Sequence, residues 1–545
     1  MTASADRKLF SPVQIGPITL QHRVVMAPLT RSRSEQPGDV PGPLMLEYYS
    51  QRASEGGLIV TEATTIAIAG RGWYGAPGLY SDAQVAGWRK IVDAVHAKGG
   101  FLFSQLWHTG RSSHVDMRDG AQPAGPSVVP SYWLNAEPVI STPTGWKKPS
   151  PHRAIEIAEI PGIIEDYRKA AERAKAAGFD GVEVHSANGY LLDEFLQDGS
   201  NHRTDAYGGV IENRARLLLE VTEAVVSVWG GDRVGVRIGP GGTWNQMSDS
   251  SPDALFDYVA AQLNRFGLAY LHIVEPRVKG NVVIVEGQDP IATERLRKIF
   301  KGKIISAGGY EPDTAETAVE KGDADAVAFG RHFISNPDLP KRIKLGLPLS
   351  DYDRKTFYTF EARGYTDYPS YDRQSGAVLA DPFCPQLHKP AFYLDCRPEA
   401  DGAPSSASDV VRCAAKNKAL VLEAFDTLFN KRDYAAAERF WSPHYIQHSA
   451  HIAPGRDGLF NLVKSAPPNL KYEPGAIVAE NDFVMVHGRF SNNGRPVSWI
   501  AADILRIKDG VLVEHWDVLQ DEATHESSKS GLPMFGETFV SAASA

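Results

Sequence analysis

The sequence predicts two folded parts, a (β/α)8 barrel of the α/β class followed by a small α+β domain. The chain has 545 residues, which is too long for a single hydrophobic core. Eight short apolar runs alternate with helix-like segments, and a stretch rich in proline and serine then separates them from a region with a different pattern. We therefore expect the barrel over 1–380, a linker over 381–408 and the second domain over 409–545.

The apolar runs predict parallel strands, because strands that are buried on both faces show no alternation and are joined by helices. The expected strands are 24–27, 58–61, 101–106, 181–185, 234–238, 270–273, 303–306 and 326–329. The expected helices are 85–98, 164–177, 213–228, 252–266 and 312–321. Eight such units indicate a closed barrel. The alternative is an open doubly wound sheet, but no Gly-x-Gly-x-x-Gly turn follows the first strand.

A long excursion over 110–150, rich in proline, serine and glycine, follows the third strand. Loops that follow barrel strands lie on the catalytic face, so this segment is expected to form a lid or rim there.

The second domain begins with two expected helices, near 417–429 and 434–440. Turn residues at 480–482, 492–494 and 508–510 then separate alternating runs that are typical of hairpins. Helices followed by a meander predict a small α+β domain with a curved antiparallel sheet.

Composition excludes several classes of partner. A net charge of −9 argues against nucleic acid, which needs a basic face. No apolar run reaches the length of a membrane span, and the N-terminus carries no secretory signal, so a cytoplasmic protein is expected. The spacing of Cys384, Cys396 and Cys413 matches no metal or redox motif, so no metal is expected.

The run His185-Ser186-Ala187-Asn188-Gly189-Tyr190 directly follows the fourth strand. It offers two hydrogen-bond donors and one phenolic acid at a strand end. The donors could hold a carbonyl oxygen and stabilise an enolate, and the phenol could protonate a carbon. The alternative is that these polar side chains only cap the next helix.

Other strand ends indicate an anionic cofactor. Gly308 and Gly309 follow the seventh strand, and Gly330 and Arg331 follow the eighth, where barrels commonly bind phosphate. Arg237 at the barrel mouth would bury a cation unless an electron-rich ring meets it. Gln105 and Thr30 add hydrogen-bonding groups for a ring edge.

The first part of the chain, from about 8 to 371, resembles the Old Yellow Enzyme family of ene-reductases, which bind FMN in a (β/α)8 barrel. The matching motifs lie at 24–31, 105–111, 185–196, 205–209, 212–214, 275–277, 329–331 and 364–369. The resemblance implies that FMN is held by Pro28, Leu29, Thr30, Ala63, Gln105, Arg237, Gly308, Gly309, Gly330 and Arg331.

The same resemblance implies a ping-pong mechanism in which NAD(P)H reduces the flavin and leaves. An α,β-unsaturated aldehyde or ketone, or a nitroalkene, then takes its place. His185 and Asn188 would grip the substrate oxygen, hydride would pass from flavin N5, and Tyr190 would donate the proton. Trp107 and Tyr358 would shape the pocket.

The second domain resembles the SnoaL-like family of small cone-shaped α+β domains, through motifs at 445–448, 500–507 and 513–520. The residues expected at its pocket are His448, His487, Asp503, Glu514 and Trp516. Three roles stay open: an accessory cyclase or aldol-type catalyst, a ligand-binding module, and an oligomerisation module that forms a homodimer. In one alternative the barrel acts as a redox isomerase while the second domain performs the net cyclisation.

Overall fold

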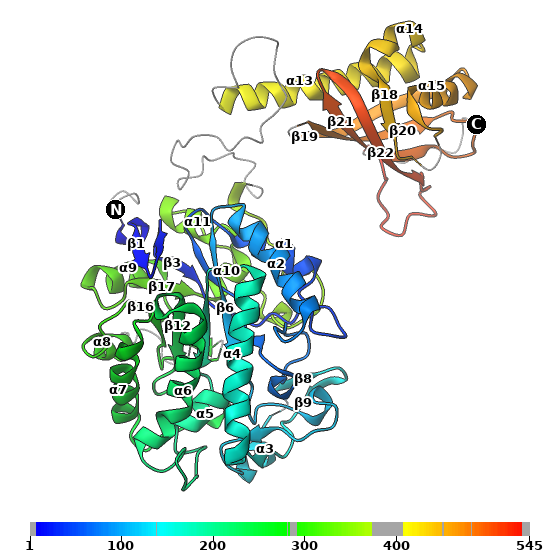
Figure 1. Ribbon diagram of the computed structural model, residues 1–545. Helices are drawn as coiled ribbons and strands as arrows, with labels where there is room; N and C mark the ends of the chain where they lie inside the picture. Colours follow the sequence, from blue (N-terminus) through cyan, green and yellow to red (C-terminus); the bar gives the residue numbers. More distant parts are fainter. Residues whose placement is uncertain are drawn as a thin grey trace. The chain divides into compact units, whose positions relative to one another are not determined.

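The computed structural model describes residues 7–137, 139–280, 282–283, 291–372, 407–449, 452–480 and 482–536. The chain divides into two compact units, Met1–Pro385 and Gln386–Ala545, and each is described by itself (Figure 1). The predicted linker over 381–408 lies outside the described residues except for its last two. Among the described helices, none is long and apolar enough to cross a membrane.

Eight parallel strands close into a barrel in the described part of the first unit. Their order around the barrel is β3, β4, β6, β11, β12, β13, β16, β17 and back to β3. They are β3 (Val24–Met26), β4 (Leu58–Val60), β6 (Phe101–Trp107), β11 (Gly181–Ser186), β12 (Val234–Ile238), β13 (Tyr270–Val274), β16 (Ile304–Ala307) and β17 (Ala326–Phe329). The predicted strands are confirmed, and their bounds differ from the prediction by at most about one residue.

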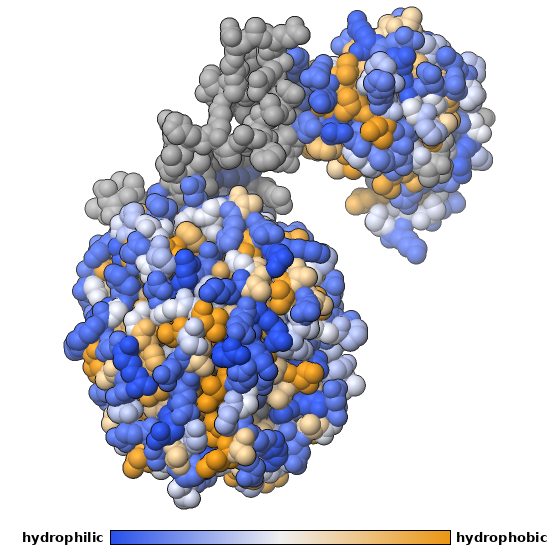
Figure 2. Space-filling model, in the orientation of Figure 1, coloured by the Kyte–Doolittle hydropathy of each residue, from blue (hydrophilic) through white to orange (hydrophobic). Residues whose placement is uncertain are grey.

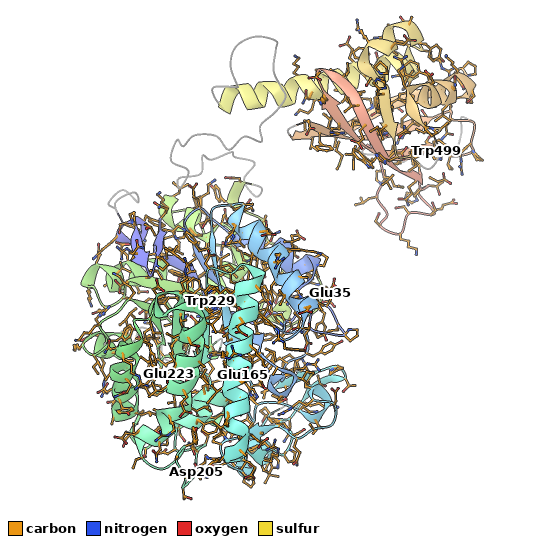
Figure 3. The ribbon with its side chains drawn as sticks, viewed as in Figure 1. Glu35, Glu165, Asp205, Glu223, Trp229 and Trp499 are labelled. Carbon is orange, nitrogen blue, oxygen red and sulfur yellow. The ribbon has the colours of Figure 1, made fainter. Side chains whose placement is uncertain are left out.

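Helices cover the outside of the barrel (Figure 1). They are α1 (Pro43–Arg52), α2 (Asp82–His96), α4 (Ile160–Ala177), α5 (Leu191–Leu196), α6 (Ile211–Trp229), α7 (Pro252–Leu263), α8 (Ile291–Arg297), α9 (Pro312–Lys321), α10 (Arg331–Ser335) and α11 (Leu339–Leu345). Helix α6 has one buried and one exposed face: Trp229 is buried and donates to the carbonyl of Ala171 on α4, whereas Glu223 is exposed (Figure 3). On the face shown in Figure 2, the surface of this unit is mostly hydrophilic.

In six of the eight barrel strands, alternate residues divide between two apolar cores, whereas β11 and β12 contribute apolar residues only to the outer core. In β3, Val24 packs outward against the helices while Val25 packs inside the barrel. The hairpin of β1 (Val13–Ile15) and β2 (Ile18–Leu20) joins the interior core at the amino ends of the strands. The hairpin therefore closes the barrel at the amino ends of the strands. A functional site is expected at the opposite end, where the strands have their carboxyl ends.

The excursion after β6 is ordered by short elements, and it includes β7 (Ala124–Gly125), α3 (Pro130–Leu134), β8 (Ile140–Thr142) and β9 (Gly145–Lys147). It is tied back to the chain by β10 (Arg153–Ala154), which pairs with β7.

The second unit packs helices against a five-stranded sheet of order β18-β22-β21-β20-β19. Its helices are α13 (Ala407–Phe425), α14 (Tyr434–Ala437) and α15 (Gly455–Ser465), with a π-helical turn at Asp426–Asn430. Its strands are β18 (Trp441–Gln447), β19 (Lys471–Glu480), β20 (Phe483–Ser491), β21 (Trp499–Lys508) and β22 (Val511–Asp521). The predicted hairpin turns at 492–494 and 508–510 separate β20 from β21 and β21 from β22, as expected, while the turn at 480–482 includes residue 481, which lies outside the described residues.

The sheet is mixed rather than wholly antiparallel, because β18 pairs in parallel with β22. The sequence concealed β18, which lies at the sheet edge and carries Pro443, a residue that only an edge strand tolerates. It also concealed α15, in which Gly455 and Gly458 are typical of a turn while Leu459, Phe460 and Val463 supply the buried face.

Candidate active site

A cavity of about 330 Å³ lies at the carboxyl ends of the barrel strands. Each of the eight strands, or the loop that follows it, contributes to the lining. The cavity includes every residue that the sequence assigned to cofactor binding: Pro28, Leu29, Thr30, Ala63, Gln105, Arg237, Gly308, Gly309, Gly330 and Arg331. The fold therefore brings together in one place residues that are more than 300 positions apart in the chain.

His185, Asn188 and Tyr190 line the same cavity. The loop between them is held in a fixed conformation: Asn188 adopts a φ of 60°, and its carbonyl accepts a 2.9 Å hydrogen bond from the side chain of Asn245. The next amide, of Gly189, donates to the Asp193 carboxylate at 2.8 Å. These contacts hold the three side chains at one wall of the site.

Two aromatic contacts fix the phenol of Tyr190. Its ring lies 5.4 Å from the His185 ring and 5.0 Å from the Trp107 ring, with Trp107 edge-on. Trp107 is buried behind Tyr190 and does not line the cavity, whereas Tyr358 does.

Burial fixes the protonation states of these groups. Burial, followed by the charge of Arg237, lowers the pKa of His185 to about 3, so its imidazole is neutral near pH 7. Burial also raises the pKa of Tyr190 far above its usual value, so the phenol keeps its proton. A neutral imidazole with one N–H and a protonated phenol are both able to donate.

A buried network lies beside the cavity and orients Gln105. Its amide nitrogen donates to Glu183 at 2.7 Å, and His272 contacts the other oxygen of the same carboxylate at 2.8 Å. Burial alone would raise the pKa of Glu183, but His272, Arg237 and Gln105 outweigh it and lower that pKa. Gln105 therefore turns its carbonyl oxygen away from Glu183, free to accept from a ring N–H.

The opposite end of the cavity is formed by glycine turns. Gly308 has a φ of 118° and Gly309 one of 67°, and Arg277 donates to the carbonyl of Gly308 at 2.7 Å. A Cβ atom on Gly308 would lie 3.1 Å from the Cβ of Glu275, so a side chain does not fit there without movement.

These features fit FMN. Arg237 is buried, and its Nε has no hydrogen-bond partner among the described residues, which suits an electron-rich ring. Arg331 and the glycine turns, where no side chain shields the backbone, suit a phosphate at the other end.

The sequence indicated Tyr358 at the pocket but did not reveal the two tryptophans that form an aromatic rim with it. Trp73 lies edge-on to Trp146 at 5.5 Å and to Tyr358 at 5.1 Å, and all three line the cavity. Trp146 belongs to the excursion, which confirms its expected place at the rim. Isolated tryptophans in loops give no periodic signal, and only the fold brings them together.

The second unit has its own cavity of about 310 Å³ between the sheet and the helices. Of the five residues predicted there, only Asp503 lines it, beside His515 and Asp517. The other four, which are His448, His487, Glu514 and Trp516, do not line it.

Strand register explains this correction. Asp503 pairs with Asp517 across the sheet, so Glu514 and Trp516, at odd spacing from Asp517, point to the opposite face. There His448 contacts Glu514 at 2.9 Å and stacks on Trp516 at a ring distance of 4.8 Å. His487 pairs with Ala502 and lies on that outer face as well.

Comparison with known proteins agrees with this geometry. Residues 8–350 match the model of the NADH:flavin oxidoreductase / NADH oxidase family. The chain belongs to this family. Residues 421–515 match the SnoaL-like domain.

Among curated relatives, the chain is 48% identical over 376 residues to 12-oxophytodienoate reductase 7 of Oryza sativa subsp. japonica, covering 66% of this chain and 94% of the relative. It is 42% identical over 384 residues to flavin oxidoreductase hxnT of Emericella nidulans, covering 66% and 97%. A structure of morphinone reductase in complex with tetrahydroNAD is 48% identical, with a TM-score of 0.63 over 68% of this chain and 100% of that one.

The resemblance to the Old Yellow Enzyme family is thereby confirmed, and so is the enzyme class. The barrel is that of an NAD(P)H-dependent flavin oxidoreductase with FMN as its cofactor. This family assignment covers the barrel only. The role of the second domain has to be inferred from the geometry of that domain.

Proposed function

We propose that the barrel reduces activated carbon–carbon double bonds of α,β-unsaturated aldehydes, ketones and nitroalkenes, with NAD(P)H as reductant in a ping-pong cycle. The observation that carries this proposal is that His185, Asn188 and Tyr190 line the same cavity as the residues assigned to FMN. The relatives named as reductases of 12-oxophytodienoate and morphinone support it.

In this proposal FMN lies against the residues already named for it. Arg237 and Gln105 would hold the ring, and Arg331 with the glycine turns would hold the phosphate. When bound, FMN would supply the hydride-transfer chemistry between NAD(P)H and the substrate.

The protein's own residues then act on the substrate oxygen and carbon. His185 and Asn188 donate hydrogen bonds to the carbonyl or nitro oxygen, where negative charge develops. Tyr190 holds its proton until the α-carbon becomes basic enough to take it. Trp107 fixes the phenol from behind, and Tyr358 with the aromatic rim limits water at the site.

The purified full chain tests this function. It should be yellow, NAD(P)H should bleach it anaerobically, and enones or nitroalkenes should restore the colour with a saturated product. A protein that stays colourless when FMN is added would contradict the proposal.

For the second domain we infer an accessory ligand-binding role, supported by its largely apolar cavity. A cyclase or aldol-type activity is the alternative, and enone products of the full chain analysed for ring closure distinguish the two. The variant Asp503→Asn would suppress ring closure in that alternative.

We also propose a homodimer through the outer face of the same sheet. That face exposes Val478, Met485 and Val518, each more than 40% accessible. Apolar patches of this kind mark contact surfaces. The cytoplasm remains the compartment that the sequence predicts.

A further inference from the structure

The second-domain cavity combines apolar walls with acidic groups at one side. Its walls include Phe425 at the end of α13, Leu459 and Val463 of α15, and Phe490 of β20. Asp503, His515 and Asp517 enter from β21 and β22, and one side-chain atom of each lies within 4.8 Å of the others. No lysine or arginine lines this cavity among the described residues.

The two carboxylates stand directly opposite each other on neighbouring strands. Like charges in this position repel, and the repulsion is strong here because Asp503 is only 3% exposed. Its Oδ1 accepts from His515 at 3.0 Å, but its buried Oδ2 has no hydrogen-bond partner among the described residues. Burial raises the pKa of Asp503 against the opposing hydrogen bond from His515, and the charge of Asp517 adds to the rise.

His515 does not neutralise this pair. The carbonyl oxygen of Gln447 accepts from the amide of Ser449 at 3.1 Å, so its NH2 group faces Nδ1 of His515 at 3.0 Å. Nδ1 is therefore an acceptor, and the single proton of a neutral imidazole sits on Nε2, where it donates to Asp503. This arrangement also leaves no nitrogen lone pair of His515 for a metal ion.

The cavity thus presents unpaired carboxylate oxygens to a space with aromatic walls. We propose that the second domain binds an organic cation with an apolar body, a protonated amine whose ammonium group lies between Asp503 and Asp517. The amine would donate to the free oxygen of Asp503 and separate the two like charges. Phe425, Phe490 and Trp499 would supply apolar and cation–π contacts to its body. Of these three, Trp499 is labelled in Figure 3.

This site is independent of the barrel chemistry, because it uses no residue of the first unit. Enone reduction therefore serves as the integrity control in every variant below.

Isothermal titration calorimetry on the FMN-loaded full chain tests the proposal. The probes are hexylamine and benzylamine, each compared with the neutral alcohol of the same carbon skeleton. The amines should bind at least about tenfold more tightly than the alcohols, since each gains a buried charge-assisted hydrogen bond.

The variants Asp503→Asn and Asp517→Asn keep the shape and remove one charge each. Both should weaken amine binding by about tenfold or more and leave alcohol binding unchanged. Glu514→Gln is the matched control, because it removes the same charge from β22 on the opposite face and should leave amine affinity unchanged.

Equal affinity for amine and alcohol, or no amine binding at millimolar concentration, would overturn the proposal. So would an equal loss in Glu514→Gln, which would show a long-range charge effect only. Binding of Mn²⁺ or Zn²⁺ without amine binding would assign the cluster to a metal instead. Should Asp503→Asn fail to fold, Asp517→Asn decides, since Asp517 is only partly buried.

Discussion

The barrel cavity collects its polar groups at the carboxyl ends of strands, whereas the second-domain cavity collects them from the middle of two strands. In the barrel the groups follow the strand in a contiguous run, such as His185 to Tyr190. In the second domain Asp503 and Asp517 face inward only because of the register between β21 and β22. The barrel arrangement can be recognised from sequence. The second-domain arrangement cannot, because successive residues of a strand point to opposite faces of the sheet and the sequence does not show which face is covered.

The two cavities also differ in charge. The barrel site presents Arg237 and Arg331, and the second site presents two carboxylates with no lining cation among the described residues. A buried charge requires a partner of the opposite sign. The comparison therefore predicts an anionic cofactor in one cavity and a cationic ligand in the other.

The largest expected effect comes from removing both oxygen-binding donors of the barrel, in His185→Ala with Asn188→Ala. Each lost donor should slow enone reduction by about 10²–10³-fold, and the pair by at least about a thousandfold. Anaerobic stopped-flow reoxidation measures this effect, and the yellow colour verifies that FMN is still bound. Undiminished turnover would remove these residues from the mechanism.

Tyr190→Phe removes the proton donor while keeping the ring that packs on Trp107. Reoxidation by enones should fall by roughly 10²-fold or more, the usual size of general acid catalysis. Flavin reduction by NAD(P)H needs no such proton and should be nearly unchanged. An equal loss in both half-reactions would indicate a structural role for Tyr190.

Glu183→Gln removes the carboxylate that orients Gln105 and partners His272. FMN affinity should fall by about tenfold, since a charge-assisted hydrogen bond contributes about 1.5–3 kcal/mol. The flavin reduction potential should rise, because a buried negative charge beside the site is lost. Glu223→Gln, an exposed change on α6, is the control and should alter neither quantity.

The pH profile of enone reduction should show no effect of His185. Its pKa is lowered to about 3, so the neutral imidazole is present at every pH above that value. Titration of His185 should therefore cause no change in the rate of enone reduction between about pH 5 and about pH 8. A loss of activity on acidification near the ordinary histidine pKa of about 6.5 would contradict this.

The smallest effect concerns assembly. Val518→Lys places a charge on the exposed outer face of the second-domain sheet, opposite the cavity. Light scattering after size exclusion should show a monomer for this variant and a dimer for the wild type, while enone reduction stays unchanged. A monomeric wild-type chain would exclude this interface.

Much of the barrel could be predicted because each strand is a short apolar run and the site residues lie at the carboxyl end of a strand or follow it. Pro28, His185 and Gly330 could be placed at the site before any contact was known. The Glu183 network could not, because a charged residue between Val182 and Val184 acquires partners only when β11, β6 and β13 lie together.

The second domain shows more clearly which site residues cannot be predicted from sequence. Asp503 could be predicted, but Glu514 and Trp516 were assigned to the cavity although they share a face opposite to it. His515 and Asp517 could not be recognised for the same reason, since both alternating sets of residues in β22 mix apolar with polar side chains and the sequence does not indicate which set is buried.

Single-turnover reoxidation under anaerobic conditions tests the central claim most directly. The full chain is reduced with one equivalent of NADPH and then mixed with one equivalent of cyclohexenone. We predict full return of the flavin absorbance and one equivalent of cyclohexanone. Flavin that stays bleached while the enone is isomerised or left intact would contradict the assignment of the barrel as an ene-reductase.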